Sequence, residues 1–240
     1  MKWWIGCSGF HYPEWKELFY PKGLAQKNWF TYYCQHFNTL ELNMTFYRFP
    51  QLKFLKDWYD KSPEEFNFSL KVPRAITHYK KFNDTERMLA DFYGTVKEGL
   101  QDKAGCVLFQ LPKQITYNDQ WLYRIIKSTN TEFNNVVEFR HPSWWRNDVY
   151  QELSKNKITF CNTSYPGLPE EMINNTSVLY YRLHGREKLY YSSYSVEKLQ
   201  ALVKEAKSKK MAKQAFFYFD NTAEGHAVTN AKEFQHLINK

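Results

Sequence analysis

The sequence predicts a single α/β barrel, and three observations carry this prediction. Apolar segments of strand length alternate eight times with segments of helical spacing, which is typical of a parallel sheet covered by helices. The chain has 240 residues, close to the roughly 250 that a closed (β/α)8 barrel needs. Polar residues also gather where the strands end. We therefore predict one TIM-barrel domain over residues 1–240, irregular around its sixth strand and its first βα loop.

The predicted strands share a period-two alternation, which places successive side chains on opposite faces. The sixth strand is the weakest, because it is short and is followed by Pro166 and Pro169. The stretch 8–23 fits neither a strand nor a helix. The predicted strands cover residues 3–7, 39–43, 66–72, 106–110, 136 onward, 158–161, 178–183 and 214–219.

The helices between these strands are predicted from apolar residues at helical spacing and from N-cap residues. Asn28, Asn118 or Asp119, and Ser195 stand directly before helical segments and can cap them. The predicted helices cover residues 28–37, 52–59, 85–101, a segment after 118, a short segment after the fifth strand, 195–210 and 226–238.

Composition narrows the class of protein. Hydrophobic residues make up 43% of the chain and aromatic residues 19%, so the core must be rich in rings. The net charge of +8 permits a nucleic-acid partner, but many lysines fall between residues 198 and 213, where a solvated helix face explains them. The four cysteines form no C-x-x-C pair. With no signal peptide and no apolar run of membrane length, we expect a cytoplasmic protein with no membrane partner.

The stretch from Val136 to Trp145 suggests where the site lies. It starts as an apolar run and then alternates, so that Glu138 and Arg140 share one face of the predicted strand. Pro142 ends the strand, because proline has no N–H to donate. A buried strand that ends in charged residues is typical of the catalytic end of a barrel strand. For one strand alone, a structural Glu–Arg ion pair is the simpler interpretation.

Other predicted strands end in the same way, which favours a functional site. Burying many charges together is costly unless they pair with one another or serve a ligand. In a barrel, these strand ends meet at one mouth. The residues expected there are Glu41, Asn43, Lys71, Gln110, Glu138, Arg140, Asn162, Arg182, His184, Asp220 and Asn221.

Several longer motifs are spread over nearly the whole chain. They include Ile5-Gly6-Cys7-Ser8-Gly9-Phe10, Phe37-Asn38-Thr39-Leu40-Glu41-Leu42-Asn43, Phe68-Ser69-Leu70-Lys71-Val72-Pro73, Glu138-Phe139-Arg140-His141-Pro142-Ser143-Trp144, Arg182-Leu183-His184-Gly185 and Gly225-His226-Ala227-Val228. In these motifs the chain resembles the domain-of-unknown-function-72 family, the YecE-like barrels. The resemblance implies the TIM-barrel fold and no particular reaction. The chain departs from the family pattern at Asn162, where an Asp is frequent nearby, and at Asp220, where an Asn is common.

We predict an enzyme, a hydrolase or an isomerase, that uses acid–base chemistry on a small anionic substrate, for example a phosphorylated one. Arginine and lysine suit oxyanion contacts, and a histidine beside carboxylates suits proton transfer. The predicted catalytic residues are Glu41, Glu138 and His184. The predicted substrate-binding residues are Asn43, Lys71, Gln110, Arg140, Arg182, Trp144 and Tyr194.

Two alternatives stay open. The first is a metal-dependent, nuclease-like hydrolase with a divalent cation on Glu41, Glu138, His184 and Asp220. Three cations at the same mouth disfavour it, so no metal site and no cofactor are predicted. The second is a non-catalytic barrel that binds nucleic acid or a metabolite by stacking on rings such as Tyr47, Trp144, Trp145, Tyr190 and Tyr194.

Overall fold

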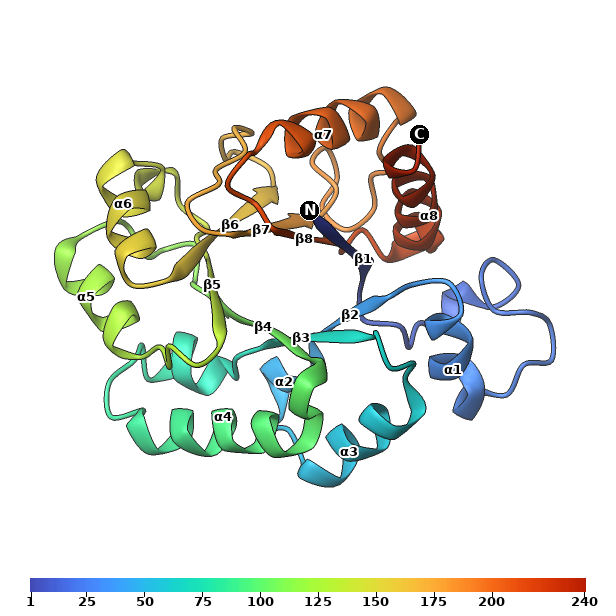
Figure 1. Cartoon of the computed structure of the whole chain (residues 1–240), viewed down its shortest axis with the longest axis horizontal. Helices are drawn as coiled ribbons and strands as arrows, with labels where there is room; N and C mark the ends of the chain where they lie inside the picture. Colours follow the sequence, from blue (N-terminus) through green and yellow to red (C-terminus); the bar gives the residue numbers. More distant parts are fainter.

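The eight predicted strands all form, and they pair in sequence order into a closed parallel barrel (Figure 1). The computed structural model describes residues 1–240. Pairing of the first and last strands, from Lys2 with Gln214 to Cys7 with Phe219, closes the barrel. The strands are β1 Lys2–Ser8, β2 Thr39–Leu42, β3 Asn67–Lys71, β4 Ala104–Gln110, β5 Asn134–Glu138, β6 Ile158–Ser164, β7 Val178–Leu183 and β8 Gln214–Phe219.

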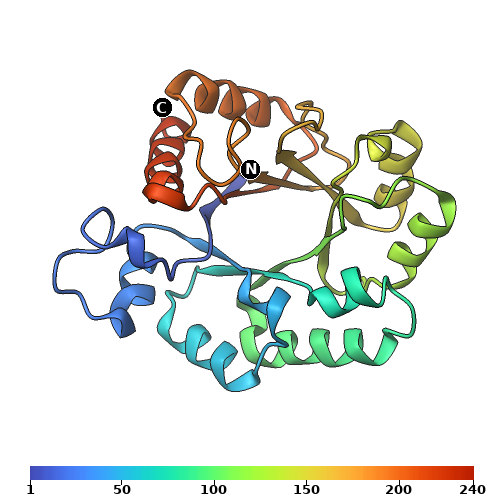
Figure 2. The same ribbon diagram turned by 180° about the vertical axis from the view of Figure 1, so that it is seen from behind.

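Helices surround the barrel on its outer side, as both views show (Figures 1 and 2). Asn118 caps α5 by accepting a hydrogen bond from Trp121 N at 2.9 Å, and Ser195 caps α7. Asn28 precedes α1 but makes no capping bond through its side chain. None of the helices has the length and apolarity to cross a membrane. They are α1 Trp29–Cys34, α2 Met44–Tyr47, α3 Leu52–Lys61, α4 Glu86–Leu100, α5 Asp119–Lys127, α6 Asn147–Lys155, α7 Val196–Ser208 and α8 His226–Ile238.

The core has two parts, because alternate strand residues face opposite sides of the barrel wall. A large cluster lies between the wall and the helices. A smaller cluster fills the barrel interior with Trp4, Cys106, Leu108, Val136, Cys161, Val178, Tyr180, Phe216 and Tyr218. This inner filling ends in polar groups, since Tyr218 OH lies 2.6 Å from Thr39 Oγ1 and donates to Ser69 Oγ at 2.8 Å.

The strand β6 is stronger than the sequence suggested. It runs to Ser164, three residues beyond the predicted end, and all seven of its residues are buried. Pro166 and Pro169 therefore lie in the loop after β6 and do not shorten the strand. Several short elements were not predicted, and two of them lie near the site: the single turn α2, and a π-helix, Ala75–Tyr79, after β3. Both are too short for a periodic apolar pattern to develop.

Candidate functional site

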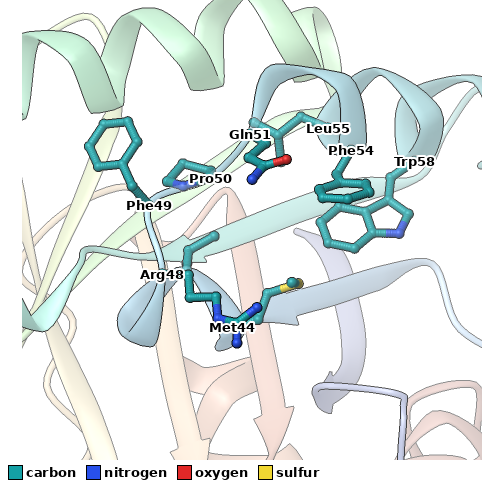
Figure 3. A pocket seen from close by; sticks show the side chains of 9 residues that line it. Met44, Arg48, Phe49, Pro50, Gln51, Phe54, Leu55 and Trp58 are labelled. Atoms are coloured by element: carbon teal, nitrogen blue, oxygen red, sulfur yellow. The ribbon is translucent and has the colours of Figure 1, made fainter.

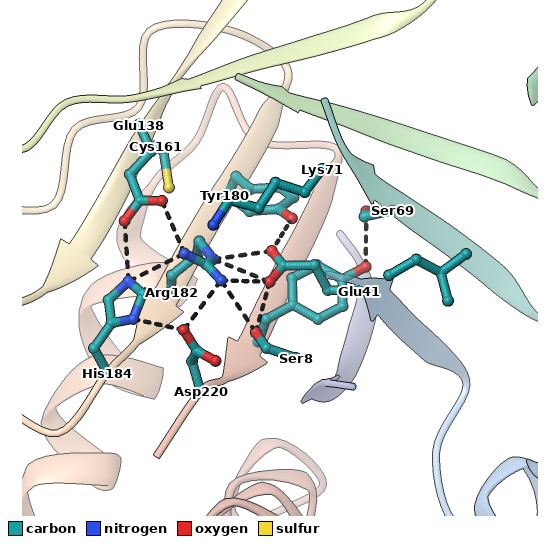
Figure 4. A network of polar contacts seen from close by, with 12 residues as sticks. Ser8, Glu41, Ser69, Lys71, Glu138, Cys161, Tyr180, Arg182, His184 and Asp220 are labelled. Atoms are coloured by element: carbon teal, nitrogen blue, oxygen red, sulfur yellow. Dashed lines mark hydrogen bonds and ion pairs between the residues drawn. The ribbon is translucent and has the colours of Figure 1, made fainter. Parts of the chain in front are cut away.

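The carboxyl ends of the strands bring polar side chains together inside the barrel (Figure 4). Four of these side chains point into the barrel, because each stands two residues after another inward residue on its strand. They are Glu41 after Thr39, Lys71 after Ser69, Glu138 after Val136 and Arg182 after Tyr180. His184 and Asp220 follow β7 and β8 directly. The cluster that was expected from strand phase is thus present, with members from β2, β3, β5, β7 and β8.

Arg182 lies at the centre of this cluster and is only 1% exposed. Its guanidinium donates to Glu41 at 2.6–3.1 Å, to Glu138 Oε2 at 2.8 Å and to Asp220 Oδ2 at 3.1 Å. Burial alone would lower the pKa of Arg182, but these three carboxylates raise it well above its usual range. Because its donors are already bound to protein carboxylates, Arg182 is poorly placed to hold a substrate anion.

Glu41 holds Arg182 from the β2 side. It is fully buried and also accepts hydrogen bonds from Ser8 Oγ and from Tyr180 OH, both at 2.6 Å. Ser8 and Tyr180 were not predicted as part of the site. Strand phase could have found Tyr180, because it stands two residues before Arg182 on the same face of β7.

Glu138 joins two arginines and a histidine. Its carboxylate lies 2.7 Å from Arg140 Nη2, 2.8 Å from Arg182 Nη1 and 3.0 Å from His184 Nε2. Burial alone would raise the pKa of Glu138, but Arg140 and Arg182 hold it well below its usual range. A carboxylate that stays ionised in this way is a weak general base.

His184 lies between two carboxylates and is fully buried. Its Nε2 faces Glu138, and its Nδ1 lies 2.7 Å from Asp220 Oδ2. The second contact has an ion-pair distance but not the direction of a hydrogen bond. Burial alone would raise the pKa of Asp220, whereas Arg182 and His184 lower it. His184 therefore links the β5 and β8 sides of the cluster.

Lys71 differs from the other charged residues because its amine has neither a hydrogen-bond acceptor nor a carboxylate partner in the protein. It is 8% exposed, makes no hydrogen bond through Nζ, and has no carboxylate oxygen within 4.0 Å. The nearest described contact is the ring of Phe46, with Nζ 4.1 Å from the ring centroid. Burial, and secondly the cation of Arg182, lower the pKa of Lys71 to about 8.

Arg140 is the second cation with free hydrogen-bonding capacity. Its Nη2 contacts Glu138, and its guanidinium stacks 4.2 Å from the ring centroid of Tyr165. Its Nε is buried and has no hydrogen-bond partner. The hydroxyl oxygen of Thr163, at the inward end of β6, is also buried without a partner. Buried polar atoms without partners are rare and often mark the place of a ligand or an ion.

The π-helix after β3 adds a residue that the sequence did not indicate. His78 packs edge-on against Phe46, with ring centroids 5.0 Å apart, and its Nδ1 lies 2.8 Å from Thr77 Oγ1. Burial, followed by the cations of Lys71 and Arg140, lowers the pKa of His78 to about 4. His78 is therefore neutral at neutral pH. Single-turn π-helices are frequent at functional sites.

Two predicted substrate-binding residues, and one further residue expected at the mouth, lie elsewhere. Trp144 is fully buried outside the barrel wall, stacked 4.1 Å from Phe139, so it cannot reach a ligand at the mouth. Tyr194 accepts a hydrogen bond from Gly185 N at 2.8 Å and fixes the loop after β7. Asn162 faces the helices, where its side chain binds both backbone polar groups of Ile173.

Two further predicted residues flank the cluster without joining it. Asn43 directly precedes α2, and its Oδ1 is buried without a partner. Gln110 occupies the end of β4 and makes only a long contact, 3.4 Å, to Leu111 O. Both side chains keep polar atoms free to meet a ligand.

The donor set gives little support to a metal ion. No group of three or more His, Cys, Asp or Glu side chains has the arrangement that a metal ion needs. The carboxylates of Glu41, Glu138 and Asp220 do converge, but the guanidinium of Arg182 occupies the space between them. A divalent cation there would have to displace a buried arginine.

A separate apolar pocket lies outside the barrel, between α2 and α3 (Figure 3). Its volume is about 80 Å³, and Phe49, Phe54 and Trp58 form much of its lining. Arg48 is the only ionisable side chain there. The pocket therefore lacks the groups for acid–base chemistry, which are concentrated at the barrel mouth.

Known proteins share this fold and sequence. The chain is 28% identical to the UPF0759 protein YecE of Escherichia coli over 142 residues, which are 59% of this chain and only about half, 49%, of YecE. It is 24% identical to the UPF0759 protein YunF of Bacillus subtilis, covering 98% of this chain and 94% of YunF. A DUF72 family crystal structure from Thermotoga maritima matches all of both chains, with a TM-score of 0.91 and 27% identity. The family model "Protein of unknown function DUF72" matches residues 4–240, so the chain belongs to the DUF72 family.

Proposed function

We propose that the protein is an enzyme that binds a small anionic substrate at the barrel mouth and transfers a proton on it. The observation that supports this most is the unpaired amine of Lys71, which is buried among charges yet has no counter-ion. A buried cation without a partner is costly unless it serves a ligand or a reaction. TIM-barrel active sites lie at this same end.

The roles divide according to which atoms are free. Arg140 Nε and Thr163 Oγ1 have no protein partner and would hold the anion of the substrate. Lys71, with a pKa of about 8, can exchange a proton near neutral pH, as a general acid or base must. Glu41, Glu138 and Asp220 act through Arg182 and position the site. The reaction class stays a hydrolase or an isomerase, since both need this exchange.

The two alternatives have less support. The metal-dependent hydrolase would need the space that Arg182 fills. The nucleic-acid barrel relied on five stacking rings. Trp144 is buried outside the wall and Tyr194 supports a loop, so Tyr47, Trp145 and Tyr190 remain for stacking. The positive net charge alone does not distinguish a nucleic acid from a small anion.

A thermal-shift experiment tests the proposal with inorganic phosphate as the probe. Phosphate should raise the melting temperature of the wild type above that in chloride of equal ionic strength, because a ligand that binds only the native state stabilises it. The increase should be lost in Arg140→Gln and reduced in Arg140→Lys, which keeps the charge but not the forked donors.

Arg146→Gln is the matched control, because Arg146 is half exposed and pairs with Asp148 on the surface. It should keep the full phosphate effect. An equal increase in all four proteins would mean that phosphate acts by general exclusion from the protein surface, and the proposed anion site would be rejected.

A further inference from the structure

The chain has two buried lysines of nearly equal exposure, Lys71 and Lys103, and their amines differ in hydrogen bonding. Lys103 is 7% exposed, and its Nζ donates to Tyr59 O at 2.7 Å and to Ser62 O and Oγ at 2.9 Å each. Its three donors are therefore all used, which is the ordinary way to bury an ammonium group. Lys71 has the same burial without any such bond.

The surroundings of Lys71 explain why its ammonium form is unfavourable. The charged groups around it are the guanidinium of Arg182 and the carboxylates of Glu138, Asp220 and Glu41. All three carboxylates already bind Arg182, and Glu138 also binds Arg140. On its other side Lys71 faces the ring of Phe46, with Nζ 4.1 Å from the ring centroid. This cation–π contact favours the ammonium form, but it supplies neither a negative charge nor a carboxylate oxygen to replace lost water. A desolvated amine beside another cation is the setting that activates lysine as a nucleophile.

We propose that Lys71 forms an imine with the carbonyl group of an anionic substrate, such as an oxo acid or a phosphorylated aldehyde or ketone. This inference rests on the proposed function for the anionic part of the substrate. It makes Lys71 the nucleophile in place of the general acid or base, and it adds the class of the reacting group.

The step balances without any further reactant. The lone pair of the neutral Lys71 amine attacks the carbonyl carbon, and the C=O π pair moves to the oxygen, which gains a proton while the nitrogen loses one. The resulting carbinolamine takes up one more proton on its hydroxyl group and releases water, leaving a protonated imine. Net, one amine, one carbonyl and one proton give one iminium and one water.

An iminium would suit the proposed function, because it withdraws electrons from the neighbouring carbon. A C–H bond on that carbon becomes more acidic, which is the activation that an isomerase needs. The cation of Arg182, which disfavours an ammonium on Lys71, disfavours an iminium as well. The carboxylate or phosphate of the substrate, held near Arg140, would offset that repulsion.

Reductive trapping on the wild-type protein tests the inference. Glyoxylate, a small anionic aldehyde, is added at neutral pH with cyanoborohydride, and the modified lysines are located by peptide mass spectrometry. Lys71 should be labelled at least about tenfold faster than typical surface lysines, since more of its amine is neutral at this pH. Lys103, with the same burial, is the internal control and should stay unlabelled. Lys71→Met should lose only the fast label.

The outcomes separate the imine from the anion site. Labelling of Lys71 no faster than that of the surface lysines would overturn the inference. If glyoxylate still raised the melting temperature through Arg140, the proposed function would stand without it. Fast labelling by glyoxylate that is slowed in Arg140→Lys supports both. Equally fast labelling by glyoxylate and by neutral propanal, in both proteins, supports the imine and rejects the anionic substrate.

Discussion

At the scale of single residues, the charge of Lys71 is costly to the fold at neutral pH. Its pKa falls from an ordinary 10.5 to about 8, which corresponds to about 3 kcal/mol against the folded state when the amine is charged. Below pH 8 the amine of Lys71 is protonated in both the folded and the unfolded chain, so the full cost to the folded state applies there. The cost disappears as the pH rises from 8 toward 10.5, where only the unfolded chain still holds the proton.

Replacing Lys71 by methionine should therefore stabilise the protein at neutral pH. Methionine keeps most of the length of the side chain and removes the charge. Lys71→Met should therefore unfold at a higher urea concentration than the wild type at pH 7, with a free energy of unfolding larger by up to about 3 kcal/mol. The difference should shrink between pH 8 and pH 10. Urea titrations at these pH values measure it, and a loss of stability at pH 7 would show that the ammonium has a favourable partner.

Among the elements, the loop between β7 and α7 depends on one residue of α8. Asn230 accepts hydrogen bonds from Tyr194 N at 3.1 Å and Asn221 Nδ2 at 2.9 Å, and donates to Tyr194 O at 3.0 Å. Tyr194 in turn binds Gly185 N. One asparagine thus ties the loop that carries His184 to the end of β8.

Asn230→Ala should loosen this loop. It leaves the backbone N–H and C=O of Tyr194 without partners, at about 1–3 kcal/mol each. We therefore expect a total loss of about 2–6 kcal/mol and faster proteolysis between residues 185 and 194. Urea unfolding and limited proteolysis measure both effects. Asn83→Ala is the control, because Asn83 is exposed and bonds only Lys80 O. Equal effects of the two changes would contradict this role.

The sequence predicted strands and side-chain phase well, because alternation in a buried strand is a strong local signal. Glu41, Lys71, Glu138 and Arg182 were found in this way. It could not predict how they pair, since Arg182 could equally serve a ligand or close the barrel, and that depends on distances across the interior. Trp144 was misplaced because a residue just past a strand no longer follows its alternation. His78 was missed because a single π-turn leaves no periodic pattern.

For the whole molecule, the charge network couples stability to acidity. The pKa of Glu138 is lower in the folded state than in the unfolded chain. Its contribution to stability is therefore complete above its pKa in the unfolded chain and is lost as the pH falls through its pKa in the folded state. Glu138→Gln should cost about 3–5 kcal/mol at pH 7, since it breaks buried ion pairs. Its difference from the wild type should narrow below about pH 4.

Urea unfolding from pH 7 to pH 3 measures this dependence. Glu132→Gln is the control, because Glu132 pairs with Lys97 on the exposed surface. It should change the stability little at any pH. If the difference caused by Glu138→Gln stayed constant down to pH 3, the acid sensitivity of the protein would have another origin.

The contacts of Arg182 also determine when the site can form during translation. Glu41 and Arg182 are separated by 141 residues, and Asp220 comes 38 residues later still. A nascent chain that has released only β1 to β4 from the ribosome contains Glu41 but not yet the guanidinium of Arg182. The site therefore comes into existence only after β8 has been translated, and a truncated product that ends before β7 cannot form it.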